Sequence, residues 1–514
     1  MHAIRVTALA GMLLIASCVS RPEAVPEVST LARETAAYAV DAYGDSAIGA
    51  LGALVGFRTV ATDVPFDPRS PAVTAMTSYL RDHAEAFGLD FADHGAVVVI
   101  GLGDARDRLG IVTHGDVQPA DPTKWARDPF SLDTESEPGL LLGRGAEDDK
   151  GSIALAMYAM RALADRGVPL RRRIELVVSY TEESDWAPFQ EFLAEWDAPD
   201  LNVALDSDYP VVTAEKGWGA IFLSSRAGEA ASARAPGEGG PGLVSFTGGQ
   251  FLSQIPGDAE ARIVRPTPEV EAGLRAAADA DTAVSYAFRV RGDTLLIAAA
   301  GVAAHSSTPW DGMNAITHLA GVLDAQRWPP NQVVGLMRLI NDLVGTGDYA
   351  DRFGDLAYQD DFMGPLTLSL TTLGWQDGVL VAGINIRRPV GRSAVEVEGS
   401  IRRAVSAWSD AARVTVDVNT TIGDPHYLED APHIPTLLAV FRAYTGIQDA
   451  GPVSIGGGTH ARLLPNGVNF GPAMPGEPYS GHSEHEFITR DQFLLNLQMY
   501  AAMLVELAGS VENP

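Results

Sequence analysis

The 514-residue sequence predicts an α/β fold that is interrupted by an inserted α+β domain. Before Gly217, short apolar runs that end in glycine or polar residues alternate with amphipathic segments, which is typical of strands alternating with helices. After Gly217 the pattern changes to alternating strands, and helical segments return from Ile434. Strands that alternate with helices imply a mostly parallel central sheet with helices on both faces, and functional residues of such folds gather beyond the carboxyl ends of the strands.

The elements of the α/β part follow from periodicity. Helices are predicted over residues 29–54, 71–87, 152–166, 185–196, 434–444 and 492–507. Short strands are predicted over 97–100, 109–113, 174–180, 201–205, 453–455 and 468–470.

The inserted part has a different composition. Residues 227–242 are low in complexity and predict a surface loop. Strands are predicted over 287–290, 294–300, 366–373, 379–386 and 414–418, and a helix over 394–411. Asp377-Gly378 between two of these strands is a strong hairpin signal.

These changes divide the chain into five segments. We expect a signal peptide (1–17), a tether (18–28), a catalytic domain in two parts (29–212 and 425–514) and a lid domain between them (213–424).

The N-terminus resembles a bacterial lipoprotein signal. One positive charge precedes an apolar run over 6–16, which is too short to span a membrane and suits a signal-peptide core. Small residues precede Cys18, as in the lipoprotein cleavage box. By this resemblance Cys18 is lipidated, and the protein is exported, lipid-anchored in the cell envelope and facing the periplasm. The alternative is an ordinary signal peptide with a chance cysteine.

The net charge of −29 excludes some classes of partner. Nucleic-acid binding needs a positive footprint, and so does a polybasic membrane patch. We therefore expect no nucleic-acid partner, and membrane contact only through the lipid anchor.

Two motifs place potential metal ligands at a strand end and before a helix. His114 and Asp116 follow a predicted strand, and residues two apart on an extended backbone point to the same side, so one can ligate a metal while the other orients it. The glycine-flanked turn GRGAEDDKG presents Asp148, which suits a metal-bridging carboxylate. Asp149 beside it fits a helix cap.

Three more acidic or histidine motifs follow. Glu182 and Glu183 end a strand, and two adjacent acids are cheaply desolvated only if a cation takes one and a reacting proton the other. Asp206 ends the next strand, and His482 lies far downstream in GHSEHE. Because Cys18 is the single cysteine, these oxygen and nitrogen donors suit zinc, manganese or cobalt, with two metals bridged by one carboxylate.

The motifs THGDVQP, GRGAEDDKG, TEES and PGEPYSGHSEHEF resemble those of the carnosinase, carboxypeptidase G and aminoacylase metallopeptidase family. DSDYPVVTAEKG, IGGGTHAR, and Trp125 followed by Pro129-Phe130 are most similar to PepV-type bacterial dipeptidases. The resemblance spans about residues 48–507. It implies a zinc-peptidase-like catalytic domain with a lid (dimerisation-like) domain.

The resemblance also implies roles for single residues. His114 and Asp206 would hold one metal ion, Glu183 and His482 the other, and Asp148 would bridge the two. Asp116 would orient His114, and Glu182 would be the general base that takes a proton from the bridging water.

Two lid residues match the family pattern. His305 would stabilise the tetrahedral oxyanion. Arg387 would bind the terminal carboxylate of the substrate, for which a guanidinium fork is suited.

A glycine-rich loop is the remaining candidate. Backbone amides of Gly457, Gly458, Thr459 and His460 are expected to contact substrate, although such a loop can also simply turn. PepV-type enzymes often carry asparagine where this chain has Ser253, which puts side-chain preference in doubt.

The sequence therefore predicts a metal-dependent dipeptidase that uses two divalent ions, with zinc favoured over manganese or cobalt. The alternatives are an N-acyl-amino-acid deacylase or carboxypeptidase of the same family, and a non-catalytic peptide-binding lipoprotein. A small peptide is the expected substrate, and the protein is expected to be a monomer or a homodimer.

Overall fold

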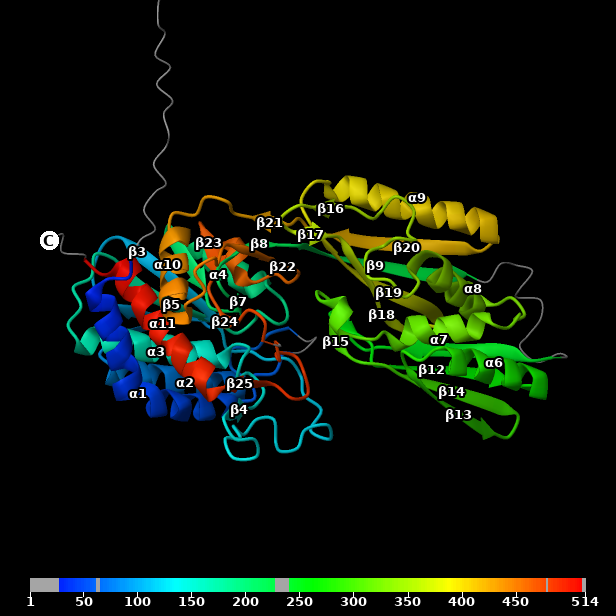
Figure 1. Ribbon diagram of the computed structural model, residues 1–514, viewed down its shortest axis with the longest axis horizontal. Helices are drawn as coiled ribbons and strands as arrows, with labels where there is room; N and C mark the ends of the chain where they lie inside the picture. Colours follow the sequence, from blue (N-terminus) through cyan, green and yellow to red (C-terminus); the bar gives the residue numbers. More distant parts are fainter. Residues whose placement is uncertain (1–26, 62–64, 227–239, 478, 511–514) are drawn as a thin grey trace, which may run out of the picture.

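The computed structural model describes residues 27–61, 65–226, 240–477 and 479–510. The predicted signal peptide, Cys18 and most of the tether lie outside the described residues, as does most of the predicted loop 227–242. The described chain forms two lobes, each built on its own large sheet (Figure 1). None of the described helices has the length and apolar character needed to cross a membrane.

The first lobe contains a nine-stranded sheet in the order β1-β2-β5-β3-β6-β23-β8-β21, with β22 paired to β8. Its strands are β1 (Asp90–Asp93), β2 (Val97–Leu102), β3 (Arg108–His114), β5 (Arg173–Ser179), β6 (Leu201–Ala204), β8 (Val212–Glu215), β21 (His426–Tyr427), β22 (Val453–Ile455) and β23 (Gly467–Asn469). The neighbours β5, β3, β6 and β23 are parallel.

The expectation of a mostly parallel sheet holds at this centre and for the β8–β22 pair, but not for the other pairs. The pairs β1–β2, β2–β5, β8–β21 and β8–β23 are antiparallel, so the sheet is mixed. The link between β1 and β2 is too short for the crossover that a parallel pair requires. The α/β fold class itself is confirmed.

Helices cover both faces of this sheet. They are α1 (Thr30–Gly56), α2 (Pro71–Ala86), α3 (Lys150–Asp165), α4 (Ala187–Glu195), α10 (Ile434–Thr445), α11 (Arg490–Ala508) and the short helix η3 (His460–Leu463). Ile111 and Leu176 enter the core beneath α1, α3, α10 and α11, whereas their neighbours Val112 and Val177 enter a second core with Phe189 of α4. Strands that are buried on both faces explain the continuous apolar runs in the sequence.

Local signals fix where these helices begin. The Ser29 side chain accepts a hydrogen bond from the Ala32 N–H, and the Ser70 side chain accepts one from the Val73 N–H. Pro71 occupies the first turn of α2, where a missing N–H costs nothing. These caps are the reason that both helices begin close to the predicted residues.

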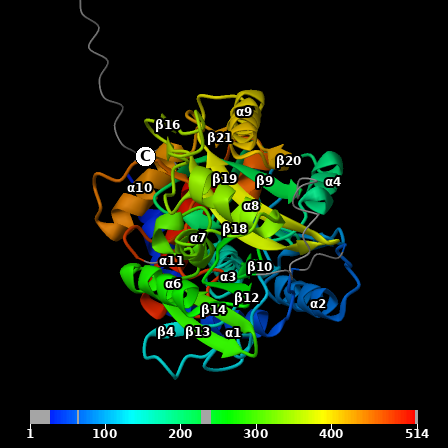
Figure 2. The same cartoon turned by 90° about the vertical axis from the view of Figure 1, so that its right-hand side faces the viewer.

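The second lobe contains an eight-stranded antiparallel sheet in the order β13-β14-β12-β10-β18-β19-β9-β20. Its strands are β9 (Gly217–Arg226), β10 (Gly242–Gly248), β12 (Asp258–Val264), β13 (Ser285–Arg291), β14 (Thr294–Ala300), β18 (Thr367–Gln376), β19 (Val379–Arg388) and β20 (Thr415–Ile422). Its helices are α6 (Pro268–Ala280), α7 (Ala315–Asp324), α8 (Gln332–Leu339), η1 (Pro309–Asp311), η2 (Ile340–Val344) and α9 (Ala394–Ala412). Figure 2, turned to view this lobe, shows α6, α7 and α8 over the sheet.

The helices and the sheet share one core. Ala382, Ile384 and Ile386 of β19 belong to that core, so Asn385 and Arg387, which alternate with them, lie on the opposite face. The predicted hairpin joins β18 to β19: Gln376 pairs with Val379, and the two turn residues between them have φ values of 49° and 80°. Positive φ at both central residues is what a type I′ turn requires.

Four two-stranded pairs complete the structure, and all but the β16–β17 pair join distant segments of the chain. They are β11 (Gln254–Ile255) with β15 (Ala304–His305), β16 (Gln359–Asp360) with β17 (Gly364–Pro365), β7 (Ser207–Asp208) with β24 (Pro472–Ala473), and β4 (Leu140–Leu142) with β25 (Phe487–Thr489). The last pair brings the GRGAEDDKG turn beside the GHSEHE motif.

Several elements of the second lobe were absent from the sequence prediction, among them β9, β10, β12 and the helices α6 to α8. β12 reads Asp-Ala-Glu-Ala-Arg-Ile-Val, and alanine on the buried face is a weak strand signal. The predicted start of the lid domain at residue 213 falls inside β8, which belongs to the first sheet.

Candidate metal centre

Three parallel strands deliver their polar residues to the same edge of the first sheet. His114 is the last residue of β3, Glu182 and Glu183 follow the end of β5, and Asp206 follows the end of β6. Because β3 pairs in parallel with both β5 and β6, the carboxyl ends of the three strands meet. The parallel pairing of the three strands therefore places these four side chains at one edge of the sheet.

Asp148 lies between the two histidines. His114 Nε2 is 2.8 Å from Asp148 Oδ1, and His482 Nε2 is 3.0 Å from Asp148 Oδ2. His482 Nε2 is also 2.9 Å from Glu183 Oε1. One carboxylate thus faces both imidazoles, one oxygen to each.

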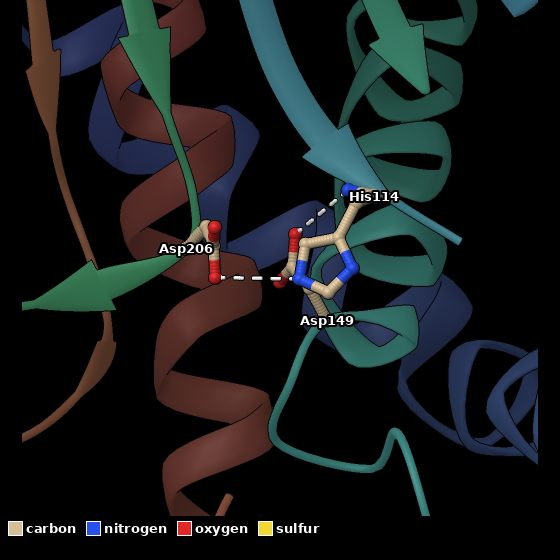
Figure 3. Close-up of side chains that lie close together, drawn as sticks. All are labelled: His114, Asp149 and Asp206. Carbon is tan, nitrogen blue, oxygen red and sulfur yellow. Dashed lines mark hydrogen bonds and ion pairs between the residues drawn. The ribbon is translucent and has the colours of Figure 1, made fainter. Parts of the chain in front are cut away.

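Asp206 and Asp149 flank His114 from two other elements (Figure 3). Asp206 Oδ1 is 3.5 Å from His114 Nε2. The Asp149 carboxylate, at the start of α3, accepts a hydrogen bond from the His114 backbone N–H at 3.3 Å. Asp149 is the N-cap residue of α3, yet its side chain makes no cap hydrogen bond, so its contact with His114 replaces the expected capping contact.

Asp116 contacts more than His114. Its backbone carbonyl is 2.9 Å from His114 Nδ1, while its carboxylate is 3.5 Å from that atom. The carboxylate accepts the backbone N–H groups of Glu182 at 3.2 Å and of Glu183 at 3.0 Å. Asp116 therefore links the strand end that carries His114 to the turn that carries both glutamates.

Glu182 lies beside this group with a free carboxylate oxygen. Its Oε1 is buried and has no hydrogen-bond partner among the described residues. Its backbone carbonyl accepts a hydrogen bond from the Trp186 indole at 2.7 Å. The Glu182 backbone is therefore held at both its N–H and its carbonyl, while one side-chain oxygen stays available.

Burial and the density of carboxylates shift the pKa values of the group. Burial, and then the charge of Asp206, raises the pKa of Glu182 well above its usual range. Burial likewise raises the pKa of Asp206 to about 6. For Asp148, burial acts in the same direction, but hydrogen bonds from His114 and His482 outweigh it and hold its pKa well below the usual value. Such a cluster of buried acids is stabilised by cations.

The donor set fits a divalent metal. His114, Asp149 and Asp206 each place one ligand atom within 4.8 Å of the others, and so do His114, Asp148 and Glu183. All the donors are imidazole nitrogens or carboxylate oxygens, and most are buried. These are ordinary ligand types for zinc and for other borderline first-row metals.

The second lobe brings His305 to this centre. Its ring lies 5.3 Å from that of His482, centroid to centroid, at an interplanar angle of 79°. Its Nδ1 accepts a hydrogen bond from the Ser307 N–H at 3.3 Å and lies 2.5 Å from Ser307 Oγ. Burial, together with the charge of Arg387, holds the pKa of His305 well below its usual value. The imidazole is therefore neutral at physiological pH.

Arg387 is buried, and its hydrogen-bond partners among the described residues are neutral. Its Nε donates to Asn385 Oδ1 at 3.0 Å, its NH1 to the Gly456 carbonyl at 3.2 Å and its NH2 to Ser306 Oγ at 3.4 Å. No carboxylate of the described residues makes an ion pair with it. Burial, with the nearby charge of Arg462, lowers its pKa to about 10.

In the glycine-rich loop, the side chains of Thr459 and His460 contact other residues of the first lobe. Thr459 Oγ1 donates to Glu215 Oε1 at 2.7 Å, and the His460 ring stacks on Phe189 with centroids 4.0 Å apart. Any contact of Gly457 or Gly458 with a ligand would therefore come from their backbone. Ser253 lies beside the His305 segment, where its carbonyl accepts the Ser306 N–H at 2.8 Å.

Sequence reasoning missed two further contacts, although both residues lie in motifs it had singled out. Gln118 of THGDVQP donates to Glu183 Oε2 at 2.9 Å. The Tyr479 hydroxyl, from PGEPYSGHSEHEF, donates to Asp148 Oδ2 at 2.5 Å. Gly481 permits this approach, because a Cβ there would collide with the Tyr479 ring.

Comparison with known proteins gives consistent matches. The sequence model described as "Peptidase family M20/M25/M40" matches residues 110–506. The chain is 30% identical over 458 residues to the putative dipeptidase YtjP of Bacillus subtilis (strain 168), covering 86% of this chain and 92% of that protein. It is 29% identical over 445 residues to the Beta-Ala-Xaa dipeptidase of Lactobacillus delbrueckii subsp. lactis, covering 86% and 90%. Human carnosine dipeptidase 1 shares the fold, with a TM-score of 0.57 at 16% identity over 94% of this chain and 99% of that one.

Proposed function

Because the chain belongs to peptidase family M20/M25/M40, we propose that its site hydrolyses dipeptides with two divalent metal ions and with Glu182 as the general base. The protein is a metal-dependent dipeptidase that acts on short peptides, and the family resemblance of its motifs is confirmed. The proposal on mechanism is carried by one observation: Asp148 lies between His114 and His482, with one carboxylate oxygen facing each imidazole.

The contacts around Asp148 support one division of the ligands between the two ions. We assign His114 and Asp206 to one ion, Glu183 and His482 to the other, and Asp148 to both. Zinc is favoured, with manganese and cobalt as alternatives, because imidazole and carboxylate are ordinary zinc ligands. When bound, such ions polarise the scissile carbonyl and lower the pKa of the attacking water.

Glu182 moves the proton. Its free oxygen accepts a proton from the attacking water and then returns it to the leaving amine. Its backbone is held by Asp116 and by the Trp186 indole, which fixes the point from which the side chain extends. Asp116 thereby positions the general base as well as His114.

His305 provides a hydrogen bond to the developing oxyanion. Its Nδ1 accepts the Ser307 N–H, so the proton of the neutral ring resides on Nε2. That N–H is free to donate to the carbonyl oxygen of the substrate as negative charge develops there.

Arg387 binds the terminal carboxylate of the dipeptide. A buried guanidinium whose protein partners are all neutral retains its full charge for an anionic ligand. The backbone of Gly457 and Gly458 adjoins Gly456, which Arg387 contacts, and we include it in the same subsite. The side chains of Thr459 and His460 hold this loop in place through Glu215 and Phe189.

The geometry also supports a site completed by a single chain. His305 and Arg387 belong to the second lobe of the same molecule whose first lobe supplies the metal ligands, and the His305 ring lies beside that of His482. A monomer therefore suffices for activity, and a homodimer would add no residue that the site lacks. Specific activity that stays constant on dilution, together with a monomeric mass in solution, is the expected result.

A rate comparison tests the function. Chelated protein is reloaded with zinc, manganese or cobalt and assayed with a dipeptide and with its N-acetylated form. We expect metal-dependent hydrolysis of the free dipeptide. Faster cleavage of the N-acetylated form would indicate the deacylase alternative, and metal binding without any hydrolysis would indicate a peptide-binding protein. Neither alternative is favoured by the dipeptidase relatives.

For the location of the protein, the support is the sequence motif around Cys18. The proposed state is an exported protein, anchored by acyl chains on Cys18 and facing the periplasm. Wild-type protein should fractionate with membranes, and C18A should appear in the soluble fraction. A C18A protein that stays with membranes would contradict the anchor.

A further inference from the structure

Two acidic residues beside the metal centre have no role in the mechanism above. Glu147 belongs to the Asp148 loop (143–149), and Glu486 belongs to the His482 loop (480–486). Both side chains are buried, with 4% and 0% of their surface exposed. Each of them reaches into the other loop, across more than 330 residues of sequence.

Glu486 holds the Asp148 loop. Its Oε1 accepts the backbone N–H groups of Gly145 at 2.9 Å, Glu147 at 3.1 Å and Asp148 at 3.2 Å. Its Oε2 pairs with Arg144 at 2.6 Å. The backbone of the bridging carboxylate Asp148 is thereby bonded directly to the opposite loop.

Glu147 holds the His482 loop in return. Its Oε2 accepts the Ser480 N–H and the Ser480 hydroxyl, each at 2.6 Å, and the Gly481 N–H at 3.2 Å. These groups immediately precede His482, whose φ of 63° is rare for a residue with a side chain. The bonds from Glu147 fix the chain just before this unusual conformation.

Arg144 of the Asp148 loop also bonds to the His482 loop. In addition to its ion pair with Glu486, it donates to the Ser483 carbonyl at 2.9 Å and lies over the Trp125 ring at 5.5 Å. Only 2% of its surface is exposed. A buried ion pair contributes little to stability by itself, but removing one partner leaves an uncompensated charge, so such pairs are strongly specified in position.

We propose that Glu147, Glu486 and Arg144 are positioning residues that lock the Asp148 loop to the His482 loop, so that Asp148 and His482 converge before any metal binds. The inference rests on the proposed metal assignment and extends it to residues that touch neither metal nor substrate. Residues that orient metal ligands from outside typically contribute about 10- to 100-fold to metal affinity.

The test compares E486Q, E147L and E147Q with a matched control. Glu486 uses one oxygen for Arg144 and the other for the backbone amides of the Asp148 loop, so E486Q, with a single acceptor oxygen, cannot satisfy both. Its oxygen is expected to stay with the buried Arg144 guanidinium and to release the amides. Glu147 uses a single oxygen, and E147L removes that acceptor for the Ser480 and Gly481 amides. E147Q keeps an acceptor oxygen and should rescue the function of Glu147. E175Q is the control, because Glu175 is also buried and pairs with Arg108 at 3.0 Å, but on β5 at the end of the sheet away from the site.

Two readouts are needed, both independent of activity. In chelated protein, hydrogen exchange should accelerate at residues 145–148 in E486Q and at residues 480–481 in E147L, each in the loop opposite the substitution. Zinc titration by calorimetry should show affinity weakened about 10- to 100-fold in E486Q and E147L, and near the wild-type value in E147Q and E175Q.

Unchanged exchange in the opposite loop, or wild-type zinc affinity in both E486Q and E147L, would overturn the inference. A fall in thermal stability with unchanged zinc affinity would also overturn it, since that is a purely structural effect. If E486Q does not fold, the pair E147L and E147Q decides the question alone. Failure of the wild-type enzyme to cleave dipeptides would reject the proposed function but leave the zinc and exchange results interpretable.

Discussion

The candidate residues of the first lobe lie where parallel strands of its sheet end. In the second lobe, by contrast, His305 lies on the short strand β15 and Arg387 lies within strand β19. His114, Glu182, Glu183 and Asp206 are tied to one another and to two loops by buried polar contacts. In the second lobe, the side chains that hydrogen-bond to His305 and Arg387 among the described residues are neutral. In the proposed mechanism, the first region therefore handles charge and protons, and the second recognises the substrate and its oxyanion. Substitutions in the two regions should have separable kinetic effects.

The largest effect is expected from E182Q in the first region. Removing the general base should lower kcat by about 10²- to 10⁴-fold, because a positioned base contributes that much to rate. Metal content, measured by elemental analysis, should remain at the wild-type level. A loss of metal equal to the loss of rate would contradict the separation of Glu182 from the ligands.

H305A tests the lid side of the comparison. Loss of one oxyanion hydrogen bond should reduce kcat by about 10²- to 10³-fold with little change in KM. Steady-state kinetics on one dipeptide provide the measurement, with zinc affinity as the control. An effect confined to KM would instead assign His305 to ground-state binding.

R387M should act mainly on KM. Loss of the guanidinium should raise KM for a free dipeptide about 10- to 100-fold, the value of a hydrogen-bonded charge. A dipeptide amide, which lacks the terminal carboxylate, should be affected much less. Equal effects on both substrates would show that Arg387 does not bind that carboxylate.

The smallest effect on activity is expected from H433Q, a substitution of a buried histidine of the first lobe outside the metal centre. Burial lowers the pKa of His433 to about 4 from its usual 6.5. Between pH 4 and pH 6.5, the unfolded chain therefore binds a proton at His433 that the folded protein does not. The stability that depends on a neutral His433 is fully present above pH 6.5 and is lost as the pH falls toward 4. The shift corresponds to roughly 3 kcal/mol.

Denaturant unfolding at pH 7 and pH 4.5 measures this loss. The His433 Nε2 atom lies 3.2 Å from the Asn202 carbonyl, and the glutamine side chain introduced by H433Q does not titrate but can still donate to that carbonyl. H433Q should therefore lose less stability than the wild type on acidification, with dipeptidase activity near wild type at pH 7. An equal loss of stability in both proteins would contradict the assignment.

Much of the first lobe was predictable because its signals are local. The helices α1, α2, α3, α10 and α11 and the strands β2, β3, β5 and β6 lie within a few residues of their predicted positions. The antiparallel flanks of the sheet were not predicted, because strand direction depends on which strands become neighbours. In the second lobe, alanine-rich strands such as β12 and the helices α6 to α8 carried weaker periodic signals.

The residues that end each strand could be identified without a structure, and with them the candidate ligands His114 and Asp206 and the candidate base Glu182. This was possible because strand ends and glycine turns are set by neighbours in the chain. The three-dimensional fold was needed to show that Asp148 faces both His114 and His482, and that Arg387 reaches Gly456. It also showed that Glu147 and Glu486 each accept hydrogen bonds from the opposite loop. Those contacts join residues far apart in sequence, and their geometry depends on how the two sheets and the final loop pack against one another.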